Sequence, residues 1–222
     1  YTLIGPINSF CFRNSIAAHW MPTKDLFGRD LIHSSNLMVD SHHLLFAGLQ
    51  TKCGLLERCP RGTFAFSIMS GAANVIPPKM CLNGQMVISR SLGNANDGLN
   101  IAVINARTGE AISTGTFNMW FGDVESLVTF LKAIQKDTFV LIATFDDGAT
   151  KITAEARELI AELGSSAINS LAFRDNWVFA GGKGITGKSP FEQHAKNNKS
   201  NNKYDNWPEL LELKGCLPQK LD

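Results

Sequence analysis

The chain has 222 residues, 44% of them hydrophobic and 18% charged, a composition typical of globular rather than disordered proteins. Its 21 Lys and Arg against 20 Asp and Glu give a net charge of +1, so we expect no nucleic-acid partner. Because no apolar run approaches the roughly 20 residues of a membrane-spanning helix, we also expect no membrane insertion.

The first 50 residues differ from the rest of the chain. They hold four of the five histidines but show no sustained helical or alternating pattern. The spacing of these histidines matches no metal-binding motif, so we expect no metal site there. We therefore interpret residues 1–50 as a poorly ordered or atypical extension, and residues 51–222 as the folded domain.

Regular elements begin after Cys53. Residues 63–69 alternate between apolar and polar side chains and are predicted to form a strand. Residues 99–104 and 110–118 are two further strands, and the turn-rich segment between them predicts a hairpin. A helix follows, with Asp123 as its N-cap and one apolar face, formed by Val124, Leu127, Val128, Leu131 and Ile134.

The next segment, residues 138–145, is apolar throughout and predicts a strand covered on both faces. A second helix begins after its cap, Thr153, and stops at Gly164. Residues 176–181 predict one more strand. Together these elements indicate a mixed α/β or α+β domain. The tail from Lys188 is polar until Trp207, and its histidine, His194, is expected to be a solvated surface side chain.

One glycine-rich segment imitates a nucleotide-binding motif. Residues 182–189 match the phosphate-loop pattern Gly-x4-Gly-Lys-Ser and follow a predicted strand. A phosphate loop must open a helix, however, and here Pro190 and a polar segment without an apolar face follow. A nucleotide-binding enzyme that uses Gly182–Ser189 is therefore kept only as an alternative. We find no nucleophile set or acid–base pair, and we expect neither an enzyme nor a cofactor.

A second polar cluster is a better candidate for function. Asp146 and Asp147 end one apolar strand, while Arg174 and Trp177 lie beside the start of another. If these strands are neighbours, carboxylate, guanidinium and indole groups converge at one rim. This combination suits sugar recognition, because polar groups pair with hydroxyls and an aromatic ring covers C–H surface. A structural Arg–Asp pair with a buried tryptophan remains the alternative.

The cysteines leave the redox compartment open. Cys53, Cys59, Cys81 and Cys216 lie in the patterned part of the chain, and four cysteines allow three pairings. Four reduced thiols in a cytosolic protein are the alternative to disulfides. The sequon at Asn198 favours secretion and marks a candidate glycosylation site.

Several motifs in order resemble the ILEI/PANDER family of secreted, cytokine-like proteins, most closely its interleukin-like member. The resemblance covers about Cys53 to Asp222 and rests on Ser70-Gly-Ala-Ala-Asn-Val, Phe173-Arg-Asp-Asn-Trp-Val-Phe, Lys188-Ser-Pro-Phe-Glu-Gln-His and Trp207-Pro-Glu-Leu. It implies a compact β-β-α fold of the α+β class, also called a GG-type lectin domain, with two β-sheets flanked by short helices. It also implies the disulfides Cys53–Cys81 and Cys59–Cys216.

The resemblance also implies a sugar site. A similar domain in the stem of the O-mannose N-acetylglucosaminyltransferase binds carbohydrate, and the likeness places Asp147 and Arg174 in contact with sugar and Trp177 nearby. Two positions depart from the family. Asp97 precedes Gly98 where the family usually has arginine, and Ala180 replaces an unpaired cysteine linked to disulfide dimerisation. With Ala180, we expect a monomer unless Cys11 substitutes.

The resemblance therefore predicts a secreted, extracellular signalling protein that binds a cell-surface receptor, with carbohydrate recognition as one route. The alternatives are a receptor ligand without sugar binding and, much less favoured, the nucleotide-binding enzyme.

Overall fold

The computed structural model describes residues 51–219, which form two antiparallel sheets with two short α-helices. This arrangement confirms the predicted α+β class; the expected extension, residues 1–50, lies outside the described residues. The four-stranded sheet has the order β3-β2-β1-β9, with bounds Gln85–Ile88, Lys79–Leu82, Thr63–Met69 and Glu212–Pro218. The five-stranded sheet has the order β5-β4-β6-β7-β8, with bounds Ala111–Phe117, Gly98–Asn105, Thr138–Phe145, Asn176–Gly182 and Phe191–Ala195.

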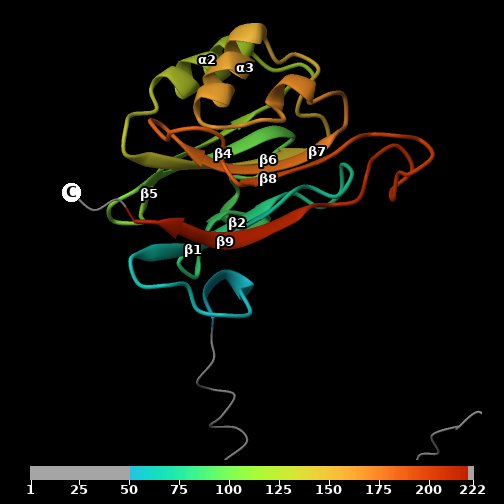
Figure 1. Ribbon diagram of the computed structural model, residues 1–222. Coiled ribbons are helices and arrows are strands. Elements are labelled where there is room, and N and C mark those ends of the chain that lie inside the picture. Colours follow the sequence, from blue (N-terminus) through green and yellow to red (C-terminus); the bar gives the residue numbers. More distant parts are fainter. Residues whose placement is uncertain (1–50, 220–222) are drawn as a thin grey trace, which may run out of the picture. The chain divides into compact units, whose positions relative to one another are not determined.

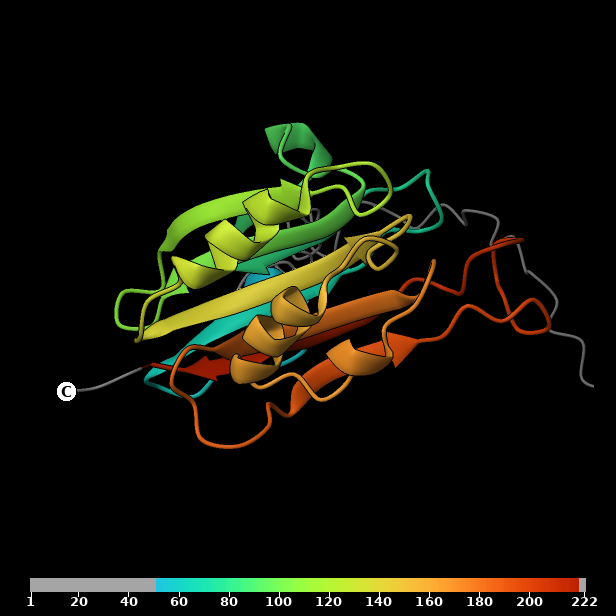
Figure 2. The ribbon, with the colours of Figure 1, turned by 90° about the horizontal axis from the view of Figure 1, so that it is seen from above.

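The domain has three layers. Helices α2 (Val124–Lys132) and α3 (Ala154–Glu162) cover one face of the five-stranded sheet, and the four-stranded sheet lies against the other face (Figure 1). Seen from above, α2 lies over the side of the sheet formed by β4 and β5, and α3 lies over the side formed by β7, with β6 between them (Figure 2). Two hydrophobic cores result: one between the helices and the sheet, and one between the two sheets.

Strand β6 is the centre of this arrangement. All eight of its residues are buried, as the uninterrupted apolar run predicts, because each face contacts a different core. Its neighbours are β4 and β7, both antiparallel to it. The end of β6 therefore lies beside the starts of β4 and β7, which brings together the segments that carry Asp97, Asp146 and Arg174.

Both helices begin at the predicted caps. The side chain of Asp123 accepts a hydrogen bond from the backbone N–H of Glu125, and that of Thr153 accepts one from Ala156. Short 3-10 turns complete the domain, at Lys52–Gly54, Arg90–Leu92 and Ile168–Ser170. Within the described residues, no helix is both long and apolar enough to cross a bilayer.

The polar tail is more ordered than its composition indicates. It contains two strands, β8 and β9, and β9 pairs with the whole length of β1 from Thr63↔Pro218 to Met69↔Glu212. Leu213 and Leu217 of β9 are buried between the sheets. Hydrophobic alternation across so few apolar residues is too weak to reveal these strands in the sequence.

Two disulfides link the segment before β1 to the four-stranded sheet. Cys53 is bonded to Cys81 in β2, and Cys59 is bonded to Cys216 in β9. These are the pairs that the family resemblance implies. The second bridge closes a sequence separation of 157 residues, so it connects the two ends of the domain.

Candidate functional site

The end of the five-stranded sheet carries a cluster of charged and aromatic side chains, which we call the rim: Asp97, Asp146, Phe173, Arg174 and Trp207. Asp146 directly follows β6, Asp97 directly precedes β4, and Arg174 lies in the turn before β7. The juxtaposition follows from the antiparallel pairing, in which Gly98 lies opposite Phe145.

Arg174 is held in place by three neighbours. Its guanidinium carbon lies 4.1 Å from the centre of a Trp207 ring and 4.7 Å from the centre of the Phe173 ring. Its Nε lies 3.8 Å from Asp146 Oδ1, which is an ion-pair contact and not a hydrogen bond. The Trp207 indole N–H donates to the same Asp146 oxygen at 3.0 Å. One carboxylate thus orients both the arginine and the tryptophan.

The backbone conformation is unusual at two residues of the rim, Asp146 and Arg174. Asp146 has φ 56° and Arg174 has φ 59°, in the left-handed region that side chains other than glycine rarely adopt. Such conformations cost free energy and concentrate at functional sites. Together, the two strained residues turn the carboxylate and the guanidinium toward each other.

Asp147, the predicted sugar contact, has a different environment. It is only 3% exposed, and its Oδ1 accepts hydrogen bonds from the backbone of Ala149 at 3.0 Å and Thr150 at 3.3 Å. Its Oδ2 is buried and has no hydrogen-bond partner among the described residues. Asp147 therefore shapes the turn after β6, while its neighbour Asp146 faces the rim.

The structure places Trp177 inside the domain and not at the rim surface. Its side chain is fully buried, stacks on Phe179 with ring centres 5.6 Å apart, and donates its indole N–H to Glu192 Oε1 at 2.9 Å. A sugar at the surface has no access to this ring. The tryptophan that does lie at the rim is Trp207, which comes from the polar tail.

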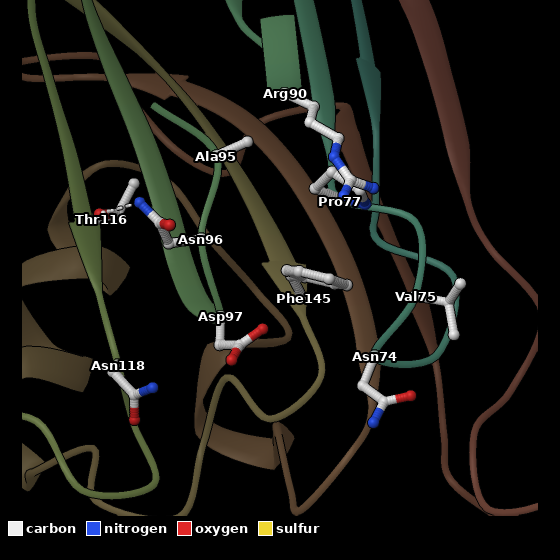
Figure 3. A pocket seen from close by; sticks show the side chains of 10 residues that line it. All are labelled: Asn74, Val75, Pro77, Arg90, Ala95, Asn96, Asp97, Thr116, Asn118 and Phe145. Carbon is white, nitrogen blue, oxygen red and sulfur yellow. Dashed lines mark hydrogen bonds between the residues drawn. The ribbon is translucent and has the colours of Figure 1, made fainter. Parts of the chain in front are cut away.

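Behind Asp97 the surface is hollowed into a polar cavity of about 480 Å³. Its walls come from the loop after β1, the Arg90–Leu92 turn, and the ends of β4, β5 and β6. Figure 3 shows Arg90 and Asp97 on opposite sides of the Phe145 ring. The other polar side chains of this wall are those of Asn74, Asn96, Thr116 and Asn118.

Asp97 reaches this position because a glycine follows it. Gly98 has φ +99°, and a Cβ there would lie 1.9 Å from the carbonyl oxygen of Phe117, so no other residue fits without moving the backbone. Burial, followed by the charge of Asp146, raises the pKa of Asp97. The carboxylate of Asp146 thus lies close enough to Asp97 to affect the ionisation of Asp97.

A hydrogen-bonded pair of aspartate and histidine side chains connects the start of β7 with β8. His194 is 11% exposed and lies with Nε2 2.7 Å from Asp175 Oδ2, so the expectation of a solvated histidine is wrong. Asp175 also accepts hydrogen bonds from the backbone of Ala172 and Asn197. The pair fixes the turn that carries Arg174, and no sequence signal marked it because the partners lie on different elements.

The nucleotide-loop pattern lacks its structural context. Gly182 ends β7, and the chain passes through Ser189 into strand β8, so no helix follows whose N-terminus could face a phosphate. Among the residues described, no group of three or more His, Cys, Asp or Glu is placed to hold a metal ion. The sequon at Asn198 lies in an exposed turn, where Ser200 Oγ donates to Asn198 Oδ1 at 2.7 Å.

Comparison with known proteins identifies the chain's relatives. The family model for the interleukin-like EMT inducer matches residues 97–185. Protein FAM3C of Rattus norvegicus is 58% identical over 171 residues, which cover 77% of this chain and 75% of the relative. Human FAM3C is 57% identical over 171 residues, which cover 77% of this chain and 75% of the relative. Human FAM3A is 51% identical over 169 residues, which cover 76% of this chain and 74% of the relative.

Proposed function

Because this chain belongs to the ILEI/PANDER family and is cytokine-like, we propose that it is secreted and signals by binding a glycosylated cell-surface receptor through the rim. The two disulfides support secretion, since such bonds persist in oxidising compartments. The observation that carries the binding role is Arg174, a guanidinium held between two aromatic rings beside Asp146.

This geometry suits carbohydrate. A sugar presents hydroxyls in a plane and a C–H face, and the rim offers charged hydrogen-bonding groups beside aromatic rings. Phe173 is 41% exposed and Trp120, whose ring centre lies 5.6 Å from that of Phe173, is 55% exposed. The adjoining cavity adds amide and hydroxyl groups that match further sugar hydroxyls.

The test is a glycan titration of the full chain followed by NMR at the tryptophan indole N–H signals. We expect a saturable shift at Trp207, which lies at the rim, and none at Trp177, whose N–H is bonded to Glu192. Arg174→Ala should abolish the shift, while Arg61→Ala, at an exposed position before β1, should leave it unchanged. Thermal unfolding of both variants checks that they fold.

The second candidate is a receptor ligand that binds no sugar. Asp97, in place of the arginine usual in the family, and the exposed aromatic residues Trp120 and Phe121 favour a protein-binding face. If a broad glycan panel leaves the Trp207 signal unchanged, this second candidate replaces the first. Receptor capture that survives enzymatic deglycosylation of the receptor-bearing cells would also favour the second candidate.

A further inference from the structure

The polar cavity behind Asp97 continues into a second cavity of about 510 Å³. The two share Val75, Pro77 and Arg90, and the second adds Lys79 from the start of β2. Both volumes fall in the range of roughly 300–1,000 Å³ typical of small-molecule sites. The two cavities therefore adjoin at their shared residues, and together they define a path that extends from the rim to the start of β2.

Charge is distributed unevenly along this path. Asp97 makes one end acidic, since the charge of its neighbour Asp146 is balanced by Arg174, whereas Arg90 and Lys79 make the other end basic. In the part of the chain that the structure describes, neither Arg90 nor Lys79 forms an ion pair. Both cations are therefore available to an anionic ligand group, and the acidic end would repel that same group.

The middle of the path offers hydrogen bonds that the fold leaves unused. The Oδ1 of Asn118 accepts from the backbone of Trp120 and Phe121, which leaves its NH₂ group for a ligand. Thr116 Oγ1 accepts from Asn96 at 3.3 Å and keeps its hydroxyl proton to donate. The Phe145 ring lies between these groups and Arg90 and is only 7% exposed, so it contributes a small apolar part of the cavity wall (Figure 3).

We propose that the two cavities bind an oligosaccharide that ends in a carboxylate-bearing sugar. The acidic sugar lies at Arg90 and Lys79, where the planar guanidinium pairs with its carboxylate through two hydrogen bonds. The neutral sugar that precedes it lies between Arg90 and Asp97, and its hydroxyls donate to the carboxylate of Asp97. The charge asymmetry fixes this orientation. The inference rests on the proposed carbohydrate recognition and names its ligand class.

The experiment compares 3′-sialyllactose with lactose, its neutral core, in NMR titrations of the full chain with its disulfides intact. We expect at least tenfold tighter binding of the sialylated sugar at low salt, with shifts at the Arg90 and Asp97 backbone signals. Arg90→Gln should remove this advantage and leave the affinity for lactose unchanged. Arg61→Gln, which removes an arginine outside both cavities, should have no effect on either sugar.

Asp97→Asn tests the orientation. This substitution should weaken the binding of both sugars by a similar factor, because Asp97 contacts the neutral part that they share. Equal binding of the two sugars by the unaltered chain would overturn this inference and leave carbohydrate recognition standing. A preference for the sialylated sugar that persists in Arg90→Gln would also overturn it. If neither sugar binds, the inference fails, and the broad glycan panel decides separately whether the carbohydrate route of the proposed function stands.

Discussion

At the scale of single residues, Glu192 in β8 is the most heavily hydrogen-bonded side chain of the helix-side core. Its Oε2 accepts from the backbone N–H of Ser166 at 2.7 Å and of Ala167 at 3.2 Å, and from the Ser166 hydroxyl. Its Oε1 accepts from the indole of Trp177 and the hydroxyl of Ser165. Five donors on one carboxylate connect β7, β8 and the segment after α3.

Glu192→Gln should lower the free energy of unfolding by about 2–3 kcal/mol. The glutamine amide keeps one acceptor oxygen, but its NH₂ group replaces the other oxygen and faces N–H and O–H groups that are themselves donors. Urea unfolding at pH 7 measures this loss. Gln193→Glu, an exposed change on the neighbouring residue, is the control and should leave the midpoint nearly unchanged. Equal stability of Glu192→Gln and the unaltered chain would contradict the role assigned to the carboxylate.

The buried pair of Asp175 and His194 predicts acid sensitivity. Burial by itself raises the pKa of Asp175, but the hydrogen bonds from His194, Asn197 and Ala172 outweigh it, and the pKa lies below its ordinary value. A carboxylate of this kind stabilises the fold above its unfolded pKa, and the stabilisation is lost as the pH falls through the folded pKa. Glu192, whose hydrogen bonds likewise outweigh burial and lower its pKa, adds to the same trend.

We therefore expect the urea midpoint to fall as the pH drops below about 5, because the carboxylates of the unfolded chain then take up protons before those of the folded protein do. Asp175→Asn should be less stable than the unaltered chain at pH 7 and should lose less stability on acidification. Parallel pH profiles for the two proteins would show that the Asp175 carboxylate does not contribute.

At the scale of elements, the sequence predicts the parts whose pattern is local. The two helices, their caps, the β4–β5 hairpin and the apolar strand β6 all follow from short-range periodicity and turn residues. Strands β2, β3, β8 and β9 do not, because they are short or half-exposed. Their formation depends on pairing with β1, β2 or β7, which no local pattern records.

The residues of the candidate site also divide into those that local sequence patterns predict and those that depend on contacts between distant segments. Arg174 and the two carboxylates after β6 can be singled out because they flank predicted strands. Trp207 cannot, because its contact with Asp146 spans 61 residues of sequence and crosses the polar tail. The prediction that Trp177 lies near the rim surface rests on its nearness to Arg174 in the chain, although alternation along β7 turns its side chain into the helix-side core.

The attachment of β9 to β1 is both covalent and hydrogen-bonded, and the two contributions can be separated. In the chain-entropy model, a bridge over a loop of this length contributes about 4–5 kcal/mol. Cys216→Ser, paired with Cys59→Ser to avoid a free thiol, should therefore lower the melting temperature by about 10 °C. Because the β1–β9 ladder remains, we expect a native-like NMR spectrum at 25 °C. An unchanged melting temperature would show that the bridge adds nothing.

At the scale of the whole molecule, β6 connects the two hydrophobic cores. Val140 and Ile142 belong to the core under the helices, and Leu141 and Ala143 belong to the core between the sheets. Neither core can lose its packing without exposing the opposite side chains of the same strand. We therefore expect residues 51–219 to unfold as one cooperative unit.

This cooperativity is testable with the probes that the chain already carries. The NMR signal of the Trp177 indole N–H, which is bonded to Glu192, reports on the helix-side core, and far-UV circular dichroism reports on both sheets. We expect coincident transitions in urea with the disulfides intact. Two separated transitions would mean that the four-stranded sheet and the helical layer are independently stable.

The Cys59–Cys216 bridge also makes most of the domain a covalent ring. A protease that cuts the exposed turn at Asn198, or any other peptide bond between the two cysteines, leaves the two fragments joined. The nicked protein should migrate as one band on a denaturing gel without reductant and separate into pieces only after reduction. A single proteolytic cut between Cys59 and Cys216 can therefore open a loop of this molecule without releasing either fragment.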